Sequence, residues 1–239
     1  MPNSWFHFKL FTIQQEHAAM KVGTDGVLLG AWASLPGPGS RVLDVGTGTG
    51  LIALMLAQRT KNVMIDALEI DHASAGQAKE NFENSPWNGK LRCLPISFQR
   101  YASQSANSYD LVISNPPYFS DSTLTPSMEL NLARHDHSLS LEDLLKGSLS
   151  LMKPTGKISL VLPVQKEAQL RELIAEHNLF CNRLTRVKPT PGKAANRILI
   201  ECSHMDGNTH TDELTIETEQ RHVYSEKFKD LVNEFYLEP

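Results

Sequence analysis

Apolar runs alternate with amphipathic segments along most of the 239-residue chain. The runs are rich in valine, isoleucine and leucine without strict polar alternation, as expected for strands of a sheet that is covered on both faces. The segments between them repeat apolar residues at helical spacing. This pattern predicts an α/β fold with a mostly parallel, doubly wound sheet. Strands are expected at 41–46, 63–70, 109–114, 157–163, 183–187 and 197–202, and helices at 51–60, 71–84, 141–152 and 165–178.

The two ends of the chain depart from this alternation. The last two predicted strands are joined through "KPTPGKAAN" without a helix, which predicts an antiparallel hairpin at the sheet edge. The tail begins with a loop and a candidate strand, and it ends in a helix with apolar residues on one face. We therefore expect an N-terminal segment (1–33), a central domain (34–204) and a C-terminal strand–helix appendage packed on the core (205–239).

Composition and cysteine usage predict a cytoplasmic protein. No apolar run approaches the roughly 18–20 residues that a membrane helix needs, and "MPNSWFHFKL" does not resemble a secretory leader. The three cysteines are far apart and lack metal-ligand spacing, which predicts free thiols in a reducing compartment. A net charge of −4 argues against wholesale coating of nucleic acid but allows a local basic patch. We expect a monomer.

A glycine-rich stretch, "VLDVGTGTG", follows the first predicted strand and precedes a helix. Gly46, Gly48 and Gly50 permit a tight turn and a close approach of a ligand to the backbone. Dinucleotide-binding folds favour G-x-G-x-x-G, but Leu51 stands where the third glycine of that pattern would fall. We expect Asp44 to point its carboxylate into the pocket, where it would repel a pyrophosphate and attract an ammonium group.

This D-x-G-x-G-x-G pattern resembles motif I of the class I S-adenosylmethionine-dependent methyltransferases. The resemblance implies a Rossmann-like methyltransferase fold with S-adenosyl-L-methionine as the cofactor. In "ALEID", Glu69 ends the second strand and can accept two hydrogen bonds from a ribose diol, as adenosine cofactors of both classes require. Ile70 beside it is a further candidate cofactor contact. Asp71 either shares the role of Glu69 or caps the following helix.

The stretch "LPISFQRY", between the strands expected at 63–70 and 109–114, corresponds to the region after the third strand of the methyltransferase fold. Methyltransferases of this type often carry an acidic residue here, near the amino group of the cofactor adenine, whereas this chain has Ser97. Ser97 therefore remains a candidate contact, but the residue that recognises the adenine is open. Phe98 next to it either forms a wall of the adenine site or packs in the core.

The sequence "NPPY", Asn115 to Tyr118, lies at the carboxyl end of the fourth strand, where open α/β sheets bind their ligands. A plain strand ending is the alternative to a catalytic role. The motif is similar to the (D/N/S)-PP-(Y/F/W) signature of methyltransferases that act on adenine N6 or on glutamine amide nitrogen. The Asn115 amide oxygen and the Pro116 carbonyl can accept both N–H bonds of an amino group. Pro116 and Pro117 stiffen the turn and add no donor, and Tyr118 can stack on the substrate.

A resemblance over nearly the whole chain narrows the family. "MKVGTDGVLLGAW", "NPPY", "ARHDHSLSLEDLL", "NRILIEC" and "FKDLVNEFYL" together resemble the bacterial tRNA adenine-N6 methyltransferases that modify the nucleotide 3′ of the anticodon in a valine tRNA. In such enzymes the segment before the first strand closes over the methyl donor. Lys21, Thr24 and Asp25 thereby become candidate cofactor contacts, although Thr24 or Asp25 could simply cap a helix.

The local signal for RNA is "RLTRVKPTPGKAANR", which contains no acidic residue. It suits phosphate contacts, and an ordinary solvated charge run is the alternative. His135 and His137 lie in the long loop after "NPPY", but no further ligands stand at metal-binding spacing, so we expect no metal. The candidate RNA contacts are Arg183, Arg186, Lys188, Lys193 and Arg197.

Three classes of function remain open besides an RNA-binding module without catalysis. We favour a tRNA adenine-N6 methyltransferase. A protein glutamine N5-methyltransferase would use the same site. Such enzymes usually carry an N-terminal helical domain, whereas here only about 40 residues precede the glycine-rich stretch. A nucleotide-binding oxidoreductase is opposed by Leu51 and by "NPPY".

Overall fold

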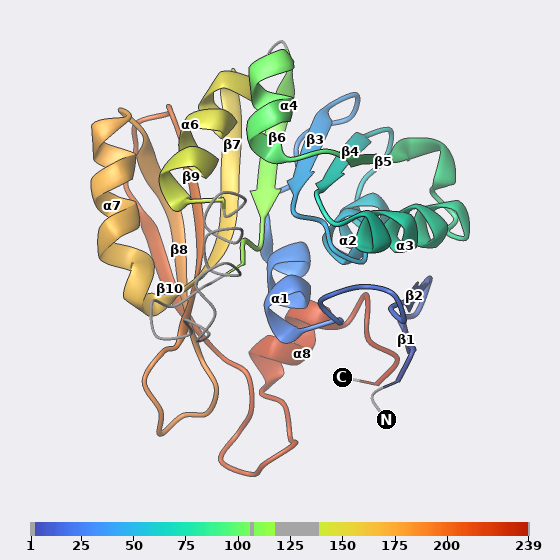
Figure 1. Cartoon of the computed structure of the whole chain (residues 1–239). Helices are drawn as coiled ribbons and strands as arrows, with labels where there is room; N and C mark the ends of the chain where they lie inside the picture. The colour runs from blue at the N-terminus through green and yellow to red at the C-terminus, as the bar shows by residue number, and fades with distance from the viewer. Residues whose placement is uncertain (1–2, 106–107, 118–138, 239) are drawn as a thin grey trace, which may run out of the picture.

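An eight-stranded sheet forms the centre of the computed structural model, which describes residues 3–105, 108–117 and 139–238 (Figure 1). The strand order is β10-β8-β9-β7-β6-β3-β4-β5. The strands are β3 (Arg41–Val45), β4 (Met64–Glu69), β5 (Leu91–Pro95), β6 (Tyr109–Ser114), β7 (Met152–Pro163), β8 (Phe180–Lys188), β9 (Arg197–Ser203) and β10 (His210–Thr215). All six strands expected from the apolar runs are present, which confirms the predicted α/β class.

The sheet is parallel except at β9. The pairs β3/β4, β3/β6, β4/β5, β6/β7 and β8/β10 are parallel, whereas β9 is antiparallel to both β7 and β8. The predicted hairpin between the last two strands is therefore confirmed, but β10 lies outside it and forms the edge. Because β9 is reversed, its first residue, Arg197, lies opposite Pro163 at the carboxyl end of β7.

Helices cover both faces of the sheet, as the strand composition predicts. One buried cluster joins α1 (Thr24–Trp32), α2 (Leu51–Arg59), α3 (His72–Glu83) and α8 (Glu226–Val232) to one face. A second cluster joins α4 (Phe98–Gln104), α6 (Leu141–Leu151) and α7 (Glu167–Glu176) to the other face. Neighbouring residues of β3 divide between them: Val42 belongs to the first cluster and Leu43 to the second.

Two glycines bring α1 close to α2. A Cβ atom at Gly30 would lie 2.7 Å from the sulfur of Met55, and one at Gly26 would lie 3.0 Å from a methyl carbon of Leu51. Arg59 of α2 also links the two helices, because its guanidinium donates to the carbonyl groups of Gly30 and Ala33 at the end of α1. This packing fixes the first turn of α1 beside the glycine-rich loop.

The chain ends pack against each other. A short hairpin of β1 (Trp5–His7) and β2 (Thr12–Gln14), absent from the sequence prediction, lies near the C-terminal segment in Figure 1. The backbone N–H of Lys9 donates to the carbonyl of Phe235 at 2.8 Å. Two 3-10 turns, η1 (Asn88–Lys90) and η3 (Val164–Lys166), complete the described elements. None of the helices in the described parts of the chain is long and apolar enough to span a membrane.

Candidate active site

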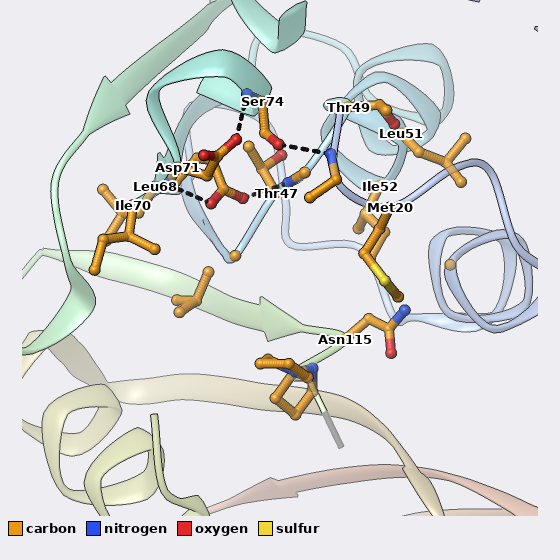
Figure 2. Close-up of a pocket in the computed structure, with 18 of the residues that line it drawn as sticks. Met20, Thr47, Thr49, Leu51, Ile52, Leu68, Ile70, Asp71, Ser74 and Asn115 are labelled. Atoms are coloured by element: carbon orange, nitrogen blue, oxygen red, sulfur yellow. Dashed lines mark hydrogen bonds between the residues drawn. The ribbon is translucent and has the colours of Figure 1, made fainter. Parts of the chain in front are cut away.

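A cavity of about 650 Å³ opens at the carboxyl ends of β3, β4 and β6 (Figure 2). This size suits a nucleoside-sized ligand. Four parts of the chain form most of its wall: the N-terminal segment up to the start of α1, the glycine-rich loop, the segments after β4 and β5, and the turn after β6. The wall includes Ala19–Gly26, Val45–Thr49, Leu68–Asp71, Ser74, Ile96–Gln99, Asn115–Pro117, Leu139 and Arg197. The motifs singled out in the sequence therefore meet in one place.

The backbone donors of the glycine-rich loop are already used by the protein. The N–H groups of Gly46 and Thr47 both donate to the carbonyl of Leu68 at 2.9 Å. The N–H of Gly48 donates to the Glu69 carboxylate at 2.9 Å. A loop that binds phosphate needs such donors for the anion, and it would not hold a carboxylate among them. This arrangement does not suit a pyrophosphate.

The three glycines of the loop all have positive φ, which side chains rarely adopt, but their surroundings differ. A Cβ atom at Gly50 would lie 2.5 Å from the ring of Phe82 on α3, so this glycine serves packing. Cβ atoms at Gly46 and Gly48 would meet nothing within 4 Å. The space over these two glycines is open to a ligand.

Asp44 lies under the loop and is fully buried, so the expectation that its carboxylate points into the cavity is wrong. One carboxylate oxygen accepts a hydrogen bond of 2.6 Å from the Thr47 hydroxyl. The other oxygen has no hydrogen-bond partner among the described residues, although the Ala53 backbone nearby favours the charged form of the carboxylate. Burial raises the pKa of Asp44 to about 7, and the negative charge of Glu69 adds to this effect.

Glu69 lies at the end of β4 on the cavity wall, together with Ile70 and Asp71. Its carboxylate accepts from the N–H groups of Gly48 and Asp71, both at 2.9 Å. The exposed Ile70 side chain adds an apolar surface to the cavity. Asp71 caps α3 by accepting from the Ser74 N–H at 2.8 Å, as the capping interpretation predicts, and this contact lowers its pKa.

Ser97, where an acidic residue is expected, caps α4 by accepting from the Arg100 N–H. Both Ser97 and Phe98 belong to the cavity wall, but the ring of Phe98 is buried in the second core cluster. The sequence prediction overlooked Gln99, whose exposed side chain also lines the cavity. No motif marks a lone glutamine as a ligand contact.

The turn after β6 brings Asn115, Pro116 and Pro117 to the cavity (Figure 2). Asn115 is half-buried and Pro116 is buried, so the turn is held by the fold rather than exposed on a free loop. The hydroxyl of the preceding Ser114 donates to the carbonyl of Val45 at 2.7 Å, which ties the turn to β3. Tyr118, the fourth residue of the motif, lies outside the described residues.

The N-terminal segment contributes Lys21, Thr24 and Asp25 to the cavity wall. Helix α1 begins at Thr24, but neither Thr24 nor Asp25 caps it, since Gly23 occupies the cap position. Asp25 instead forms a 2.8 Å ion pair with Arg197, which also lines the cavity. The Lys21 ammonium donates to the carbonyl of Asn3 at 3.3 Å.

Most of the basic residues expected to contact RNA have partners within the protein. Arg186 pairs with Glu167 at 2.6 Å, and Lys188 pairs with Glu213 at 2.7 Å. The remaining members differ in exposure. The guanidinium of Arg183 lies 4.2 Å from the centre of the Trp32 ring and donates to the Trp32 carbonyl, whereas Lys193 is exposed in the loop between β8 and β9.

No cluster of three or more metal-ligating side chains occurs within the ranges 3–105, 108–117 and 139–238. His135 and His137, the histidines considered in the sequence, lie outside the described residues. The carboxylates that line the cavity bind backbone N–H groups or Arg197.

Comparison with known proteins agrees with this geometry. Residues 22–185 match the family model "Methyltransferase small domain". A protein of Christiangramia forsetii named tRNA1(Val) (adenine(37)-N6)-methyltransferase is 46% identical over 99% of both chains. Proteins with the same name from Parabacteroides distasonis and Trichodesmium erythraeum are 46% and 43% identical, again over 99% of both chains.

Solved structures share the fold at lower identity. A predicted O-methyltransferase from Agrobacterium tumefaciens is 19% identical, with a TM-score of 0.69 over 88% of this chain and 96% of that one. TrmN from Thermus thermophilus is 20% identical, with a TM-score of 0.51 over 70% of this chain and 45% of that one. At such identities the likeness concerns the fold alone, but the match at 46% identity goes further. By that match and the family model, the chain belongs to the methyltransferase small domain family and, within it, to the family of tRNA1(Val) (adenine(37)-N6)-methyltransferases.

Proposed function

We propose that this protein transfers the methyl group of S-adenosyl-L-methionine to the exocyclic N6 of an adenine in tRNA, at position 37 of a valine tRNA. The observation that carries the proposal is the meeting of two motifs in one cavity. The turn of Asn115 and Pro116 opens onto the same space as Glu69 and the open glycines Gly46 and Gly48. One side suits an adenosine cofactor and the other suits an amino group.

Two features of the cavity wall and one buried residue beneath it fit the methyl donor. Glu69 offers carboxylate oxygens to a ribose diol, and Ile70 offers an apolar surface to a base. Asp44 is an underused buried carboxylate beneath the loop, whose ionised form a cationic ligand would stabilise. We assign cofactor contacts to Lys21, Thr24, Asp25, Gly46, Gly48, Glu69, Ile70, Asp71, Ser97, Phe98 and Asn115, with Asp44 acting from below and Gly50 holding the loop against α3.

When bound, the cofactor supplies an electrophilic methyl group on a sulfonium. The chain's own part is to hold the acceptor nitrogen in line with it. The Asn115 side-chain oxygen and the Pro116 carbonyl accept the two N–H bonds of the amino group, which favours a pyramidal nitrogen with an available lone pair. Pro116 and Pro117 bring no competing donor. We assign the stacking of the base to Tyr118. Positioning of this kind supplies most of the rate when no strong base is needed.

The names of the relatives support tRNA as the substrate. Among the basic residues, Lys193 is exposed, and Lys188 and Arg197 can exchange their carboxylate partners for phosphates. Arg183 and Arg186 complete the proposed set from positions nearer the core. A tRNA substrate also implies a cytoplasmic protein, and we propose that it acts as a monomer.

Asn115→Ala tests the catalytic assignment. Methylation of bulk tRNA from a strain that lacks the modification should fall by about 10²- to 10³-fold, a typical loss for one transition-state contact. Binding of S-adenosylhomocysteine, followed by calorimetry, should stay within threefold. Asn208→Ala, an exposed asparagine away from the cavity, is the matched control and should leave both unchanged. Full activity of the Asn115 variant would refute the assignment.

A further inference from the structure

Helix α3 carries a stripe of buried polar side chains. Ser74, Gln77 and Asn81 stand three and four residues apart on one face, and each is 2–3% exposed. Buried polar groups require hydrogen-bond partners, because desolvation without them is unfavourable. A polar helix face is normally exposed to solvent, so the burial of these three side chains requires partners within the protein.

The partners lie in the N-terminal segment 14–22, which we call the strap. The N–H and the carbonyl of Gln14 both bond to the Asn81 side chain, at 2.8 and 2.9 Å. The Gln77 side chain accepts from the His17 N–H at 3.3 Å, and the Ser74 hydroxyl accepts from the Ala19 N–H at 3.2 Å. The stripe thus holds the backbone of the strap, whatever side chains the strap carries.

Asn81 makes one contact that the other two do not. Its amide has two N–H bonds, and the second one donates to the carbonyl of Thr49 at 2.9 Å. Thr49 belongs to the glycine-rich loop, between Gly48 and Gly50. A single buried amide therefore connects the strap to the glycine-rich loop, two separate parts of the cavity wall.

The strap ends over the cavity. Met20 is 70% exposed although its side chain lines the cavity with Asn115 (Figure 2). An apolar side chain this exposed at a cavity wall gains contact area when a ligand fills the space. Ala19, immediately before Met20, donates its N–H to the Ser74 hydroxyl, so the polar stripe that holds the rest of the strap also holds the residue next to Met20.

We propose that Asn81 is a positioning residue that couples the strap to the glycine-rich loop, so that the loop conformation competent for the cofactor also sets Met20 over the reacting centre. The proposal rests on the assignment of this cavity to the cofactor. Asn81 contacts neither the cavity nor the reacting atoms. It acts through the backbones of Gln14 and Thr49.

Asn81→Leu tests the coupling, with Gln77→Met as the matched control. Both replace a buried polar side chain by an apolar one of similar size, but only Asn81 contacts the loop. Hydrogen exchange is measured on the ligand-free protein in segments 14–22 and 46–54. We expect Asn81→Leu to speed exchange in both segments and Gln77→Met to speed it in the strap alone. Faster exchange in the strap but unchanged exchange in the loop of Asn81→Leu would overturn the coupling.

The second readout is functional. For Asn81→Leu we expect the Kd for S-adenosylhomocysteine and the KM for the methyl donor to rise about tenfold, with kcat within threefold. Gln77→Met should change Kd less than threefold. An unchanged Kd in Asn81→Leu would overturn the positioning role. Failure of the wild type to bind the ligand would instead refute the proposed function, while the exchange pattern would still decide the coupling.

Thermal unfolding separates these effects from loss of fold. Should Asn81→Leu not fold, Asn81→Asp keeps the volume and the acceptor for the Gln14 N–H but turns the two donor bonds into repulsive contacts. The same exchange pattern and the same rise in Kd are expected. If this folded variant exchanges and binds as the wild type does, the proposal is wrong.

Discussion

The neighbouring strands β3 and β4 together carry one acidic residue toward their amino ends and two toward their carboxyl ends, and the surroundings of these residues differ. Toward the amino ends, Asp66 accepts from Arg41, Arg92 and the Tyr109 hydroxyl at 2.6–2.9 Å. Burial favours a higher pKa for Asp66, but these three hydrogen bonds outweigh it and hold the pKa below its usual range. The negative charge of Asp66 at this end of the sheet is therefore neutralised by basic side chains of the protein itself.

Toward the carboxyl ends the same two strands carry Asp44 and Glu69. Among the residues that the structure describes, neither forms an ion pair with a basic side chain. Asp44 is buried with one weakly satisfied oxygen, and Glu69 binds only backbone N–H groups. The fold thus neutralises Asp66 with two guanidinium groups, whereas the described residues offer Asp44 and Glu69 no such partner. In the function we propose, a ligand with positive charge and hydroxyl donors would supply the partners that these two acids lack.

The largest expected effect concerns Asp44. Its folded pKa of about 7 exceeds the value of about 4 in an unfolded chain, so the folded state holds the proton between these values and its free energy of unfolding falls as pH rises through them. Asp44→Asn removes this loss. The variant should gain on the order of 4 kcal/mol relative to the wild type between pH 4 and pH 8. Urea titrations of the ligand-free proteins measure the difference, and a difference independent of pH would contradict the assignment.

Glu69→Ala should weaken binding of the cofactor analogue with little effect on the stability of the fold. Loss of a charged acceptor for two hydroxyl groups should raise the Kd for S-adenosylhomocysteine about 100-fold, or about 2.7 kcal/mol. The free energy of unfolding should fall by only about 1 kcal/mol, since the two backbone donors become accessible to water. Calorimetry and urea unfolding give both numbers. A Kd within threefold of the wild type would remove Glu69 from the site.

Asp66→Ala is the reciprocal experiment at the amino ends. It leaves Tyr109 and two guanidinium groups without their acceptor, and should lower the free energy of unfolding by about 2 kcal/mol. The Kd for the cofactor analogue should stay within twofold. Lys153→Ala, which removes a half-exposed ion pair with Asp110, is the control and should change stability by less than about 0.5 kcal/mol. A large change in Kd for Asp66→Ala would break the distinction between the two ends.

The parts of the fold that the sequence predicts are those that leave a local pattern of apolar residues. Strands buried on both faces have sequences that are unbroken apolar runs, so the central sheet was predictable. Helix α4 buries a single residue, Phe98, and the strands β1 and β2 span three residues each, so neither leaves a periodic signal. Short elements without a periodic apolar signal are therefore among those that the sequence prediction missed.

The candidate site was likewise predictable where local motifs mark it and unpredictable where it depends on contacts between distant segments. Motifs at the ends of strands meet because parallel strands end at one edge, which is why the glycine-rich loop, Glu69 and Asn115 could be brought together in advance. The orientation of Asp44 depends on the Thr47 hydroxyl, and the pairing of Arg197 depends on Asp25, 172 residues away. Polar residues of α3 look solvated until the strap covers them. Contacts between distant segments carry no local signal.

The central claim is that the acceptor turn of Asn115 directs a methyl group from the donor bound at the carboxyl ends to adenine N6. The direct measurement uses methyl-labelled S-adenosyl-L-methionine and two unmodified valine tRNA transcripts, one with adenosine and one with guanosine at position 37. Digestion and mass spectrometry identify the labelled nucleoside. The account predicts N6-methyladenosine in the first transcript and no label in the second. Equal labelling of both transcripts, or label only in protein glutamine, would contradict it.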